Sequence, residues 1–345
     1  YSRAVAASAN VDTWEPAVSF LTLSQQANVH IGAQIGEGVY LASAGDARYP
    51  VGGIRLPKRK SGAGKVFVVA VHGQSNAVGA QEGAVVAPAN TLITTLASLS
   101  GRILAVNGGT MPHQGGQGPT TREIVIAASQ YTSLVDAREG INTWRESESI
   151  SMGIVEHLAR EYDEAAVFVV VNFGHGSSKF ENIIGSSGTK SQPLLNFELI
   201  LTELIAQAAA GDDAGFETIW GRSVEVIADV MCGHESNYVD SAAVYKNRLD
   251  VLDTRVSGWK AITSQTADIP ICIMPPSAPS NDGASPPIVN PVCTASVEWA
   301  LESPALRMVA PVYDADVGDY ATVHYPAAAH RMNGEVAGSY LARWI

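Results

Sequence analysis

The sequence predicts an α/β fold in which a parallel sheet is covered by helices on both faces. Almost wholly apolar runs of strand length recur along the chain, for example within residues 65–73 and 164–176. Stretches with the apolar spacing of an amphipathic helix separate these runs. Several runs end in glycines and polar side chains. Continuous apolar strands that alternate with helices are typical of a sheet buried on both faces, and reactive groups gather beyond the carboxyl ends of its strands.

The predicted elements begin at residue 65. In residues 148–162, Ile150, Ile154 and Leu158 fall on one face of a helix. The predicted strands are 65–73, 101–109, 164–176, 223–235, 269–277 and 306–314, and the predicted helices are 148–162, 194–210, 242–263 and 326–345. Residues 276–296 are rich in Pro, Ser and Asn, which predicts a long surface loop.

Residues 1–60 have a different pattern. They alternate weakly between apolar and polar residues and carry glycine at turn positions, which predicts a small β-rich N-terminal segment. The stretch LPKRKSGAGK, residues 56–65, is typical of a linker. We therefore divide the 345 residues into an N-terminal segment, 1–60, and a larger domain, 61–345, and the apolar fraction of 46% is enough for a large core.

The overall charge limits the partners. A net charge of −12 argues against nucleic acid, because binding a phosphate backbone needs clustered Lys and Arg, and the longest basic run is Lys58-Arg59-Lys60. No apolar run approaches the roughly 18 residues of a membrane span. The three cysteines have no metal-like spacing. We expect no metal and no other cofactor.

The first polar cluster is GQSN, at residues 73–76, directly after the predicted strand 65–73. A serine at a strand-to-helix turn presents its hydroxyl above the sheet edge, and its backbone N–H faces any developing oxyanion. Ser75 is thus a candidate nucleophile that needs a base. The alternative is an ordinary helix N-cap, the commoner fate of serine before a helix.

Three further polar clusters could complete such a site. His324 stands just ahead of the last predicted helix, where it could turn toward a nucleophile, although a surface histidine is the alternative. Residues 172–182, NFGHGSSKFEN, follow a strand and contain glycines that let backbone N–H groups approach a substrate oxygen, or simply form a tight turn. Residues 231–237, MCGHESN, run from a buried strand into charged side chains that need partners, or into a helix cap.

In their order, the four clusters resemble the motifs of the SGNH hydrolase superfamily, in particular its sialate O-acetylesterase-like branch, which includes carbohydrate esterase family six. GHGSSKFENI is similar to that branch's glycine turn, GHESN to its glutamate turn, and VHYPAAAHRMNGEVAG to its closing block. RILAVNGGT resembles a segment of phage- and prophage-borne members. The resemblance covers residues 65–345. It implies a flavodoxin-like three-layer α/β/α sandwich and metal-free removal of acetyl groups from sugars.

The resemblance also implies roles for individual residues. Ser75 matches the nucleophile, His324 the base, and Gly176 the oxyanion glycine, while Ser177 stands in place of a second glycine. Glu235 matches a glutamate that holds its turn.

The chain departs from the family at two points. The family has Asp three residues before the histidine, where this chain has Ala321. Asp319 is the nearest upstream acid, so either Asp319, Glu235 or a backbone carbonyl orients the base, or the site is a Ser-His dyad. The side-chain oxyanion donor is also open, with His234 and Asn237 as candidates. Gln74 and Asn76, beside the nucleophile, are further candidates for contact with the oxyanion or the substrate.

We therefore expect a serine esterase that removes O-acetyl groups from a carbohydrate through an acyl-enzyme. The alternative is a carbohydrate-binding or virion tail-spike protein with a degenerate, inactive hydrolase domain. A short-chain lipase-like esterase is a third, weaker hypothesis. The expected partner is an acetylated carbohydrate, the expected location is extracellular or virion-associated, and residues 1–60 could mediate homo-oligomerisation or docking to a larger assembly.

Overall fold

The computed structural model divides into two compact units, residues 1–59 and residues 60–345. It describes residues 29–36, 39–44, 47–51, 59–79, 99–107, 125–137, 149–176, 178–233, 237, 240–275, 291–310 and 327–345. In the first unit, strands β1 (Val29–Gly36), β2 (Val39–Ala44) and β3 (Ala47–Val51) form an antiparallel sheet in the order β1-β2-β3.

The second unit is built on a seven-stranded sheet in the order β10-β9-β8-β4-β7-β5-β6. All neighbouring pairs are parallel except β5 with β6. The strands are β4 (Lys65–Gly73), β5 (Ile103–Val106), β6 (Leu134–Asp136), β7 (Val167–Asn172), β8 (Ser223–Cys232), β9 (Ile271–Met274) and β10 (Arg307–Val309). β4 lies between β7 and β8, so the residues after β4 leave from the middle of the sheet.

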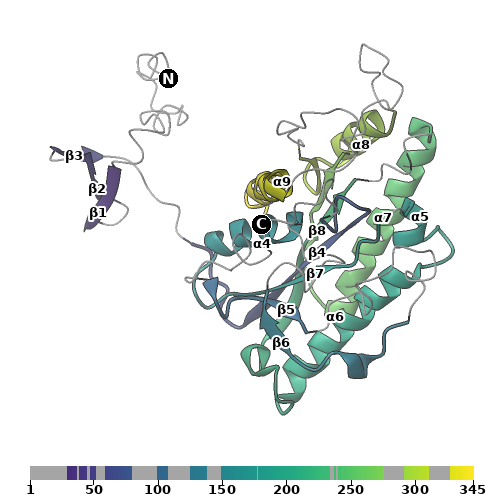
Figure 1. The fold of residues 1–345 in the computed structure, drawn as a ribbon, viewed down its shortest axis with the longest axis horizontal. Coiled ribbons are helices and arrows are strands. Elements are labelled where there is room, and N and C mark those ends of the chain that lie inside the picture. The colour runs from purple at the N-terminus through teal and green to yellow at the C-terminus, as the bar shows by residue number, and fades with distance from the viewer. Residues whose placement is uncertain are drawn as a thin grey trace. The chain divides into compact units, whose positions relative to one another are not determined.

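Helices cover both faces of this sheet (Figure 1). One face carries α5 (Phe180–Ile183), α6 (Gln192–Ala210), α7 (Ala242–Thr263) and α8 (Pro291–Glu302), and the other carries α4 (Ile150–Glu161) and α9 (Ala327–Leu341). Alternate residues of β4 enter the two cores: Val66 and Val68 pack on the first face, and Phe67 and Val69 on the second. The predicted three-layer α/β/α fold with a parallel sheet is confirmed.

The predicted loop 276–296 is wrong at its C-terminal end, where α8 begins at Pro291. Proline suits the first position of a helix because its missing N–H has no partner there in any case. Val292, Ala295 and Trp299 then recur at helical spacing and are buried. This apolar spacing outweighed the Pro- and Ser-rich composition on which the loop prediction rested. The short elements β6 and α5 were also not predicted.

Within the described residues, α6 is the one helix long and apolar enough to cross a membrane, with 19 residues and a mean hydropathy of 1.2. It packs as a core helix here: Leu194, Phe197 and Leu201 are fully buried. The three cysteines, Cys232, Cys272 and Cys293, are free thiols. Burial raises the pKa of Cys272 to about 12, which keeps that thiol protonated and unreactive.

Candidate active site

The candidate site begins where β4 ends. Gly73 has a φ of +138°, and a Cβ at this position would lie 1.9 Å from the carbonyl oxygen of Cys232 in β8. Only glycine allows the backbone at position 73 to lie this close to β8 with this φ angle, and the chain turns sharply immediately after β4. Ser75 therefore lies on a turn of residues 74–79, the nucleophile turn, at the centre of the sheet's carboxyl edge.

Ser75 does not act as a cap within the part of the chain that the structure describes. The N–H groups of Ala77 and Val78, which an N-cap oxygen would accept from, instead donate to the Gln74 carbonyl oxygen at 3.0 and 3.3 Å. The Ser75 hydroxyl makes no hydrogen bond to another described residue, and the residue is 8% exposed. Its neighbours Gln74 and Asn76 are buried as well.

The turn after β7, residues 173–176, packs directly on the nucleophile turn, and we call it the glycine turn. The N–H of His175 donates to the Gly73 carbonyl oxygen at 2.9 Å. A Cβ on Gly174 would lie 2.8 Å from that same oxygen and 3.0 Å from Val78 Cγ1. The glycine at position 174 thus lets this turn pack against the backbone beside Ser75, and the approach of its N–H groups to a substrate oxygen stays a prediction.

Two backbone donors at these turns have no acceptor among the described residues: the N–H groups of Ser75 and Gly176. Both residues are buried. More than nine in ten buried backbone N–H groups are paired, because an unpaired one costs free energy. The carbonyl of Gly176 is fixed by the His175 ring, whose Nδ1 lies 2.9 Å from it. These are the two donors that the sequence predicted for an oxyanion.

Asn172, the last residue of β7, joins the two turns and was not predicted. Its Nδ2 donates to the Ala77 carbonyl oxygen at 2.7 Å and to Ser151 Oγ at 3.0 Å, and its Oδ1 accepts the Gly174 N–H at 3.0 Å. It is 1% exposed. A polar residue that ends a run of apolar strand residues was the available signal, since a buried amide must find partners.

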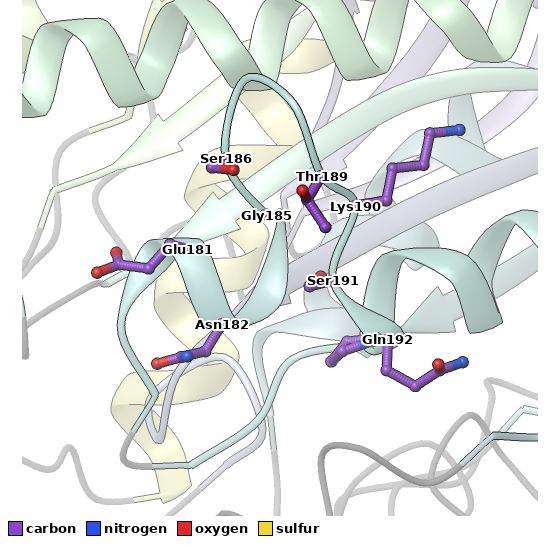
Figure 2. Close-up of a pocket in the computed structure, with 9 residues that line it drawn as sticks. Glu181, Asn182, Gly185, Ser186, Thr189, Lys190, Ser191 and Gln192 are labelled. Carbon is purple, nitrogen blue, oxygen red and sulfur yellow. The ribbon is translucent and has the colours of Figure 1, made fainter.

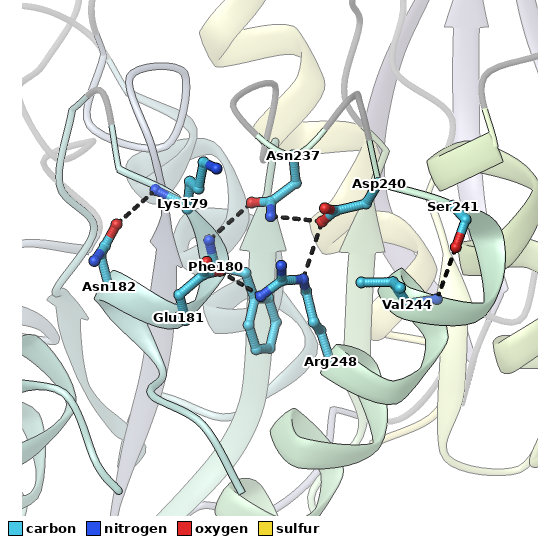
Figure 3. Close-up of polar contacts among 9 residues, drawn as sticks. All are labelled: Lys179, Phe180, Glu181, Asn182, Asn237, Asp240, Ser241, Val244 and Arg248. Atoms are coloured by element: carbon cyan, nitrogen blue, oxygen red, sulfur yellow. Dashed lines mark hydrogen bonds and ion pairs between the residues drawn. The ribbon is translucent and has the colours of Figure 1, made fainter.

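Asn237, a predicted oxyanion candidate, belongs to a polar network between β8 and α5 (Figure 3). Its Oδ1 accepts the N–H of Phe180 at 2.8 Å, and its Nδ2 donates to Asp240 at 2.7 Å. Arg248 binds the same carboxylate at 3.0 Å and pairs with Glu181. Through its contact with Phe180, this amide holds the start of α5.

A fully buried histidine–aspartate pair lies beneath the nucleophile turn. His72 Nε2 of β4 is 3.2 Å from both carboxylate oxygens of Asp229 in β8, and both side chains are 0% exposed. The His72 ring stacks on Phe173 at 4.9 Å between centroids. The sequence carried a signal that we did not use, because a histidine and an aspartate inside two core strands must each have a partner.

The helix that follows His324 starts at this edge of the sheet. α9 packs on α4 so closely that a Cβ on Gly153 would lie 2.6 Å from the Arg331 carbonyl oxygen, and one on Gly334 would lie 2.2 Å from that of Ile150. Ser151, in the first turn of α4, bonds to Asn172 at the end of β7. The first turns of α4 and α9 therefore both lie at the carboxyl edge, and Arg331 pairs with Glu156 to hold them together.

The remaining predicted residues lie outside the described part of the chain: His324, Asp319, Ser177, His234 and Glu235. The structure thus brings together Ser75, Gly176 and the buried amides around them. The roles of the five residues outside the described part stay predictions. Among the described residues, no group of three or more His, Cys, Asp or Glu side chains could hold a metal ion.

No family model matches this chain, and no curated protein sequence matches it. Solved structures that resemble it include an Arabidopsis thaliana protein (13% identity, TM-score 0.47, covering 81% of this chain and 98% of that one). NanS is similar at 14% identity, with a TM-score of 0.48 and coverage of 82% and 98%. The third is a carbohydrate esterase family 2 enzyme with a carbohydrate-binding domain from Corynascus thermopiles (Myceliophthora fergusii), at 12% identity and a TM-score of 0.38, covering 88% and 72%. At these scores the similarities do not assign a family.

Proposed function

We propose that this protein is a serine esterase that removes O-acetyl groups from a carbohydrate. One observation supports the proposal most: the N–H groups of two buried residues, Ser75 and Gly176, lack acceptors among the described residues and lie on two turns joined by the hydrogen bond from the His175 N–H to the Gly73 carbonyl. Preorganised N–H groups of this kind are what an acyl-transfer site needs to hold the negative oxygen of its tetrahedral intermediate.

In the proposed reaction, the Ser75 hydroxyl attacks the acetyl carbonyl carbon while His324 takes its proton. The oxygen that becomes negative accepts hydrogen bonds from the N–H groups of Ser75 and Gly176. The intermediate then collapses, the sugar oxygen leaves with the proton from His324, and the acetyl group remains on Ser75. Water, deprotonated by His324, hydrolyses this ester and restores the serine.

The position of α9 supports His324 as the base. Three peptide units separate His324 from Ala327, the first residue of α9, and three residues span at most about 11 Å when fully extended. Since the first turn of α9 lies at the carboxyl edge that also holds Ser75, His324 is covalently tied to the region where a base is required. The partner that orients it stays a choice between Asp319, Glu235, a backbone carbonyl and none.

The proposal is tested with Ser75→Ala and p-nitrophenyl acetate. Loss of the nucleophile should reduce turnover to the background rate, while the circular dichroism spectrum and unfolding temperature stay those of the wild type. His324→Ala should lose at least about a hundredfold in kcat, the usual scale of general-base catalysis. Undiminished turnover by folded Ser75→Ala would refute the assignment.

A carbohydrate-binding protein with a degenerate hydrolase site is the second candidate, and Ala321 favours it, because the acid of the related motif is missing at that position. A fluorophosphonate probe separates the two functions. An active esterase must be labelled at Ser75 with loss of labelling in Ser75→Ala. A degenerate site would bind acetylated polysaccharide without labelling and without releasing acetate.

A further inference from the structure

A hollow lies between α5 and α6, the two helices that follow the glycine turn in the chain. This α5–α6 pocket has a volume of about 380 Å³. Its lining residues are Glu181, Asn182, Gly185, Ser186, Thr189, Lys190, Ser191, Gln192 and Pro193. Figure 2 shows the α5 residues on one side, Ser191 and Gln192 on the other, and the intervening turn closing the end. The volume falls in the lower part of the range of small-molecule pockets, which suits one small ring.

The pocket is tied to the glycine turn by a short, fixed segment. α5 begins four residues after Gly176 and packs against β4, the strand that leads to Ser75. α5 has four residues, so it spans only about 6 Å. The Asn237 amide holds its first N–H, that of Phe180. A polymer with one unit at Ser75 could therefore place a neighbouring unit in the pocket.

The charges at the pocket are neutralised in pairs. Glu181 pairs with Arg248, and Lys190 Nζ lies 2.6 Å from Glu198. The first turn of α6 offers little to an anion, because Pro193 has no N–H and the Leu194 N–H already donates to Ser191 Oγ at 3.4 Å. An anionic ligand would thus find neither a net positive charge nor a row of free N–H groups.

Uncharged hydrogen-bonding groups remain. The hydroxyls of Ser186 and Thr189, the Nδ2 of Asn182 and the Oε1 of Gln192 make no hydrogen bond with another described residue. The backbone groups of Ser186 and Thr189 bond to each other at 2.9 and 3.3 Å, so the turn that carries the two hydroxyls is braced. Hydroxyls and amides that both donate and accept are the complement of sugar hydroxyls.

We propose that the α5–α6 pocket is a subsite for an uncharged sugar unit next to the acetylated one, so that the substrate class is an acetylated neutral polysaccharide. This inference rests on the proposed esterase function. It predicts that the pocket contributes to polymer substrates alone, because p-nitrophenyl acetate is too small to reach beyond Ser75.

The test compares Thr189→Trp, which fills the pocket, with Thr218→Trp as a control. Thr218 is exposed and lies beyond the far end of the 19-residue α6. Substrates are p-nitrophenyl acetate, a partially acetylated xylo-oligosaccharide and a partially acetylated oligogalacturonate. We expect Thr189→Trp to lower kcat/KM for the xylo-oligosaccharide at least tenfold, mainly through KM, with p-nitrophenyl acetate unchanged. Thr218→Trp should match the wild type on all three substrates, and the oligogalacturonate should be the poorer polymer.

The outcomes distinguish the two proposals. If p-nitrophenyl acetate turnover depends on Ser75 but Thr189→Trp matches the wild type on the xylo-oligosaccharide, the subsite is wrong and the esterase stands. A preference for the oligogalacturonate would overturn the neutral substrate class. If no ester is hydrolysed, calorimetric titration with the deacetylated xylo-oligosaccharide tests the subsite by itself. Binding to the wild type that is lost in Thr189→Trp supports the subsite. Equal binding to both proteins, or no binding to the wild type, rejects it.

Discussion

Replacing Asn172 with alanine should be among the most damaging single changes in the larger unit. The substitution removes three hydrogen bonds, those to the Ala77 carbonyl, the Ser151 hydroxyl and the Gly174 N–H. Each buried partner left unsatisfied costs about 1–3 kcal/mol. Because the Ser151 hydroxyl can rotate to another acceptor, we count chiefly the two backbone groups and expect a loss of about 3–5 kcal/mol, near the upper end for point mutants.

Urea unfolding followed by far-ultraviolet circular dichroism measures this loss, with an unchanged m-value as the condition for comparing midpoints. Asn196→Ala is the matched control. Asn196 is also buried, with 6% exposure. Its Oδ1 accepts hydrogen bonds from the N–H of Ile126 at 3.3 Å and from Gln192 Nε2 at 2.8 Å, and neither of these partners belongs to the two turns.

Activity supplies a second readout. At a temperature where both variants are folded, Asn172→Ala should lower kcat for p-nitrophenyl acetate about a hundredfold, the scale of a 1 Å misplacement, whereas Asn196→Ala should keep it. A stability loss below about 1 kcal/mol, or equal kcat in the two variants, would refute the interpretation that this amide holds the turns in register.

Three further predictions concern packing and charge. Gly334→Ala should destabilise the fold by about 2–3 kcal/mol, because its Cβ would lie 2.2 Å from a carbonyl oxygen of α4. Gly258→Ala should instead stabilise the fold by about 0.5–1 kcal/mol, because its Cβ would meet no atom within 4 Å. Chemical denaturation of both variants measures the two changes. Asp229→Ala should cost about 1–3 kcal/mol by removing a buried carboxylate that hydrogen-bonds to His72, and Asp229→Asn should cost less; equal unfolding midpoints would contradict this. Burial lowers the pKa of His157 below 6.5, so the unfolded chain takes up this proton more readily than the folded one. Stability should therefore fall as the pH drops from neutral to about 5, by a smaller amount in His157→Gln, as thermal melts at the two pH values would show.

The strands of the larger unit could be predicted because their apolar runs are nearly uninterrupted. The run 65–73 became β4 with the same bounds, and 242–263 became α7 in the same way. The order of the strands could not be predicted, since pairing joins segments far apart in the chain. That β4 lies between β7 and β8 is the fact that places Ser75 at the centre of the edge.

The candidate site was predictable in its residue types but not in its hydrogen bonds. Ser75 and Gly176 could be named from polar clusters at strand ends. The sequence could not tell that the amide of Asn237 holds Phe180, or that Asn172 bridges two turns, because the choice of partner depends on three-dimensional distances alone. The same ambiguity explains why Ser75 could be either a cap or a free hydroxyl until the acceptor of the neighbouring N–H groups was known.

At the carboxyl edge, the elements meet through backbone rather than through side chains. Gly73 lies against a carbonyl of β8, and Gly174 lies against the carbonyl of Gly73. In the two packed helices, Gly153 lies against a carbonyl of α9, and Gly334 lies against a carbonyl of α4. Each contact would be blocked by a single added Cβ. A segment whose backbone packs against another backbone cannot shift without losing contacts on both sides. The N–H groups of the nucleophile turn and the glycine turn are therefore held in place before any substrate arrives. An oxyanion site gains from this, because donors that need no reorganisation stabilise the transition state most. The four glycines, together with the polar residues they support, are therefore positions where we expect the chain to tolerate substitution poorly.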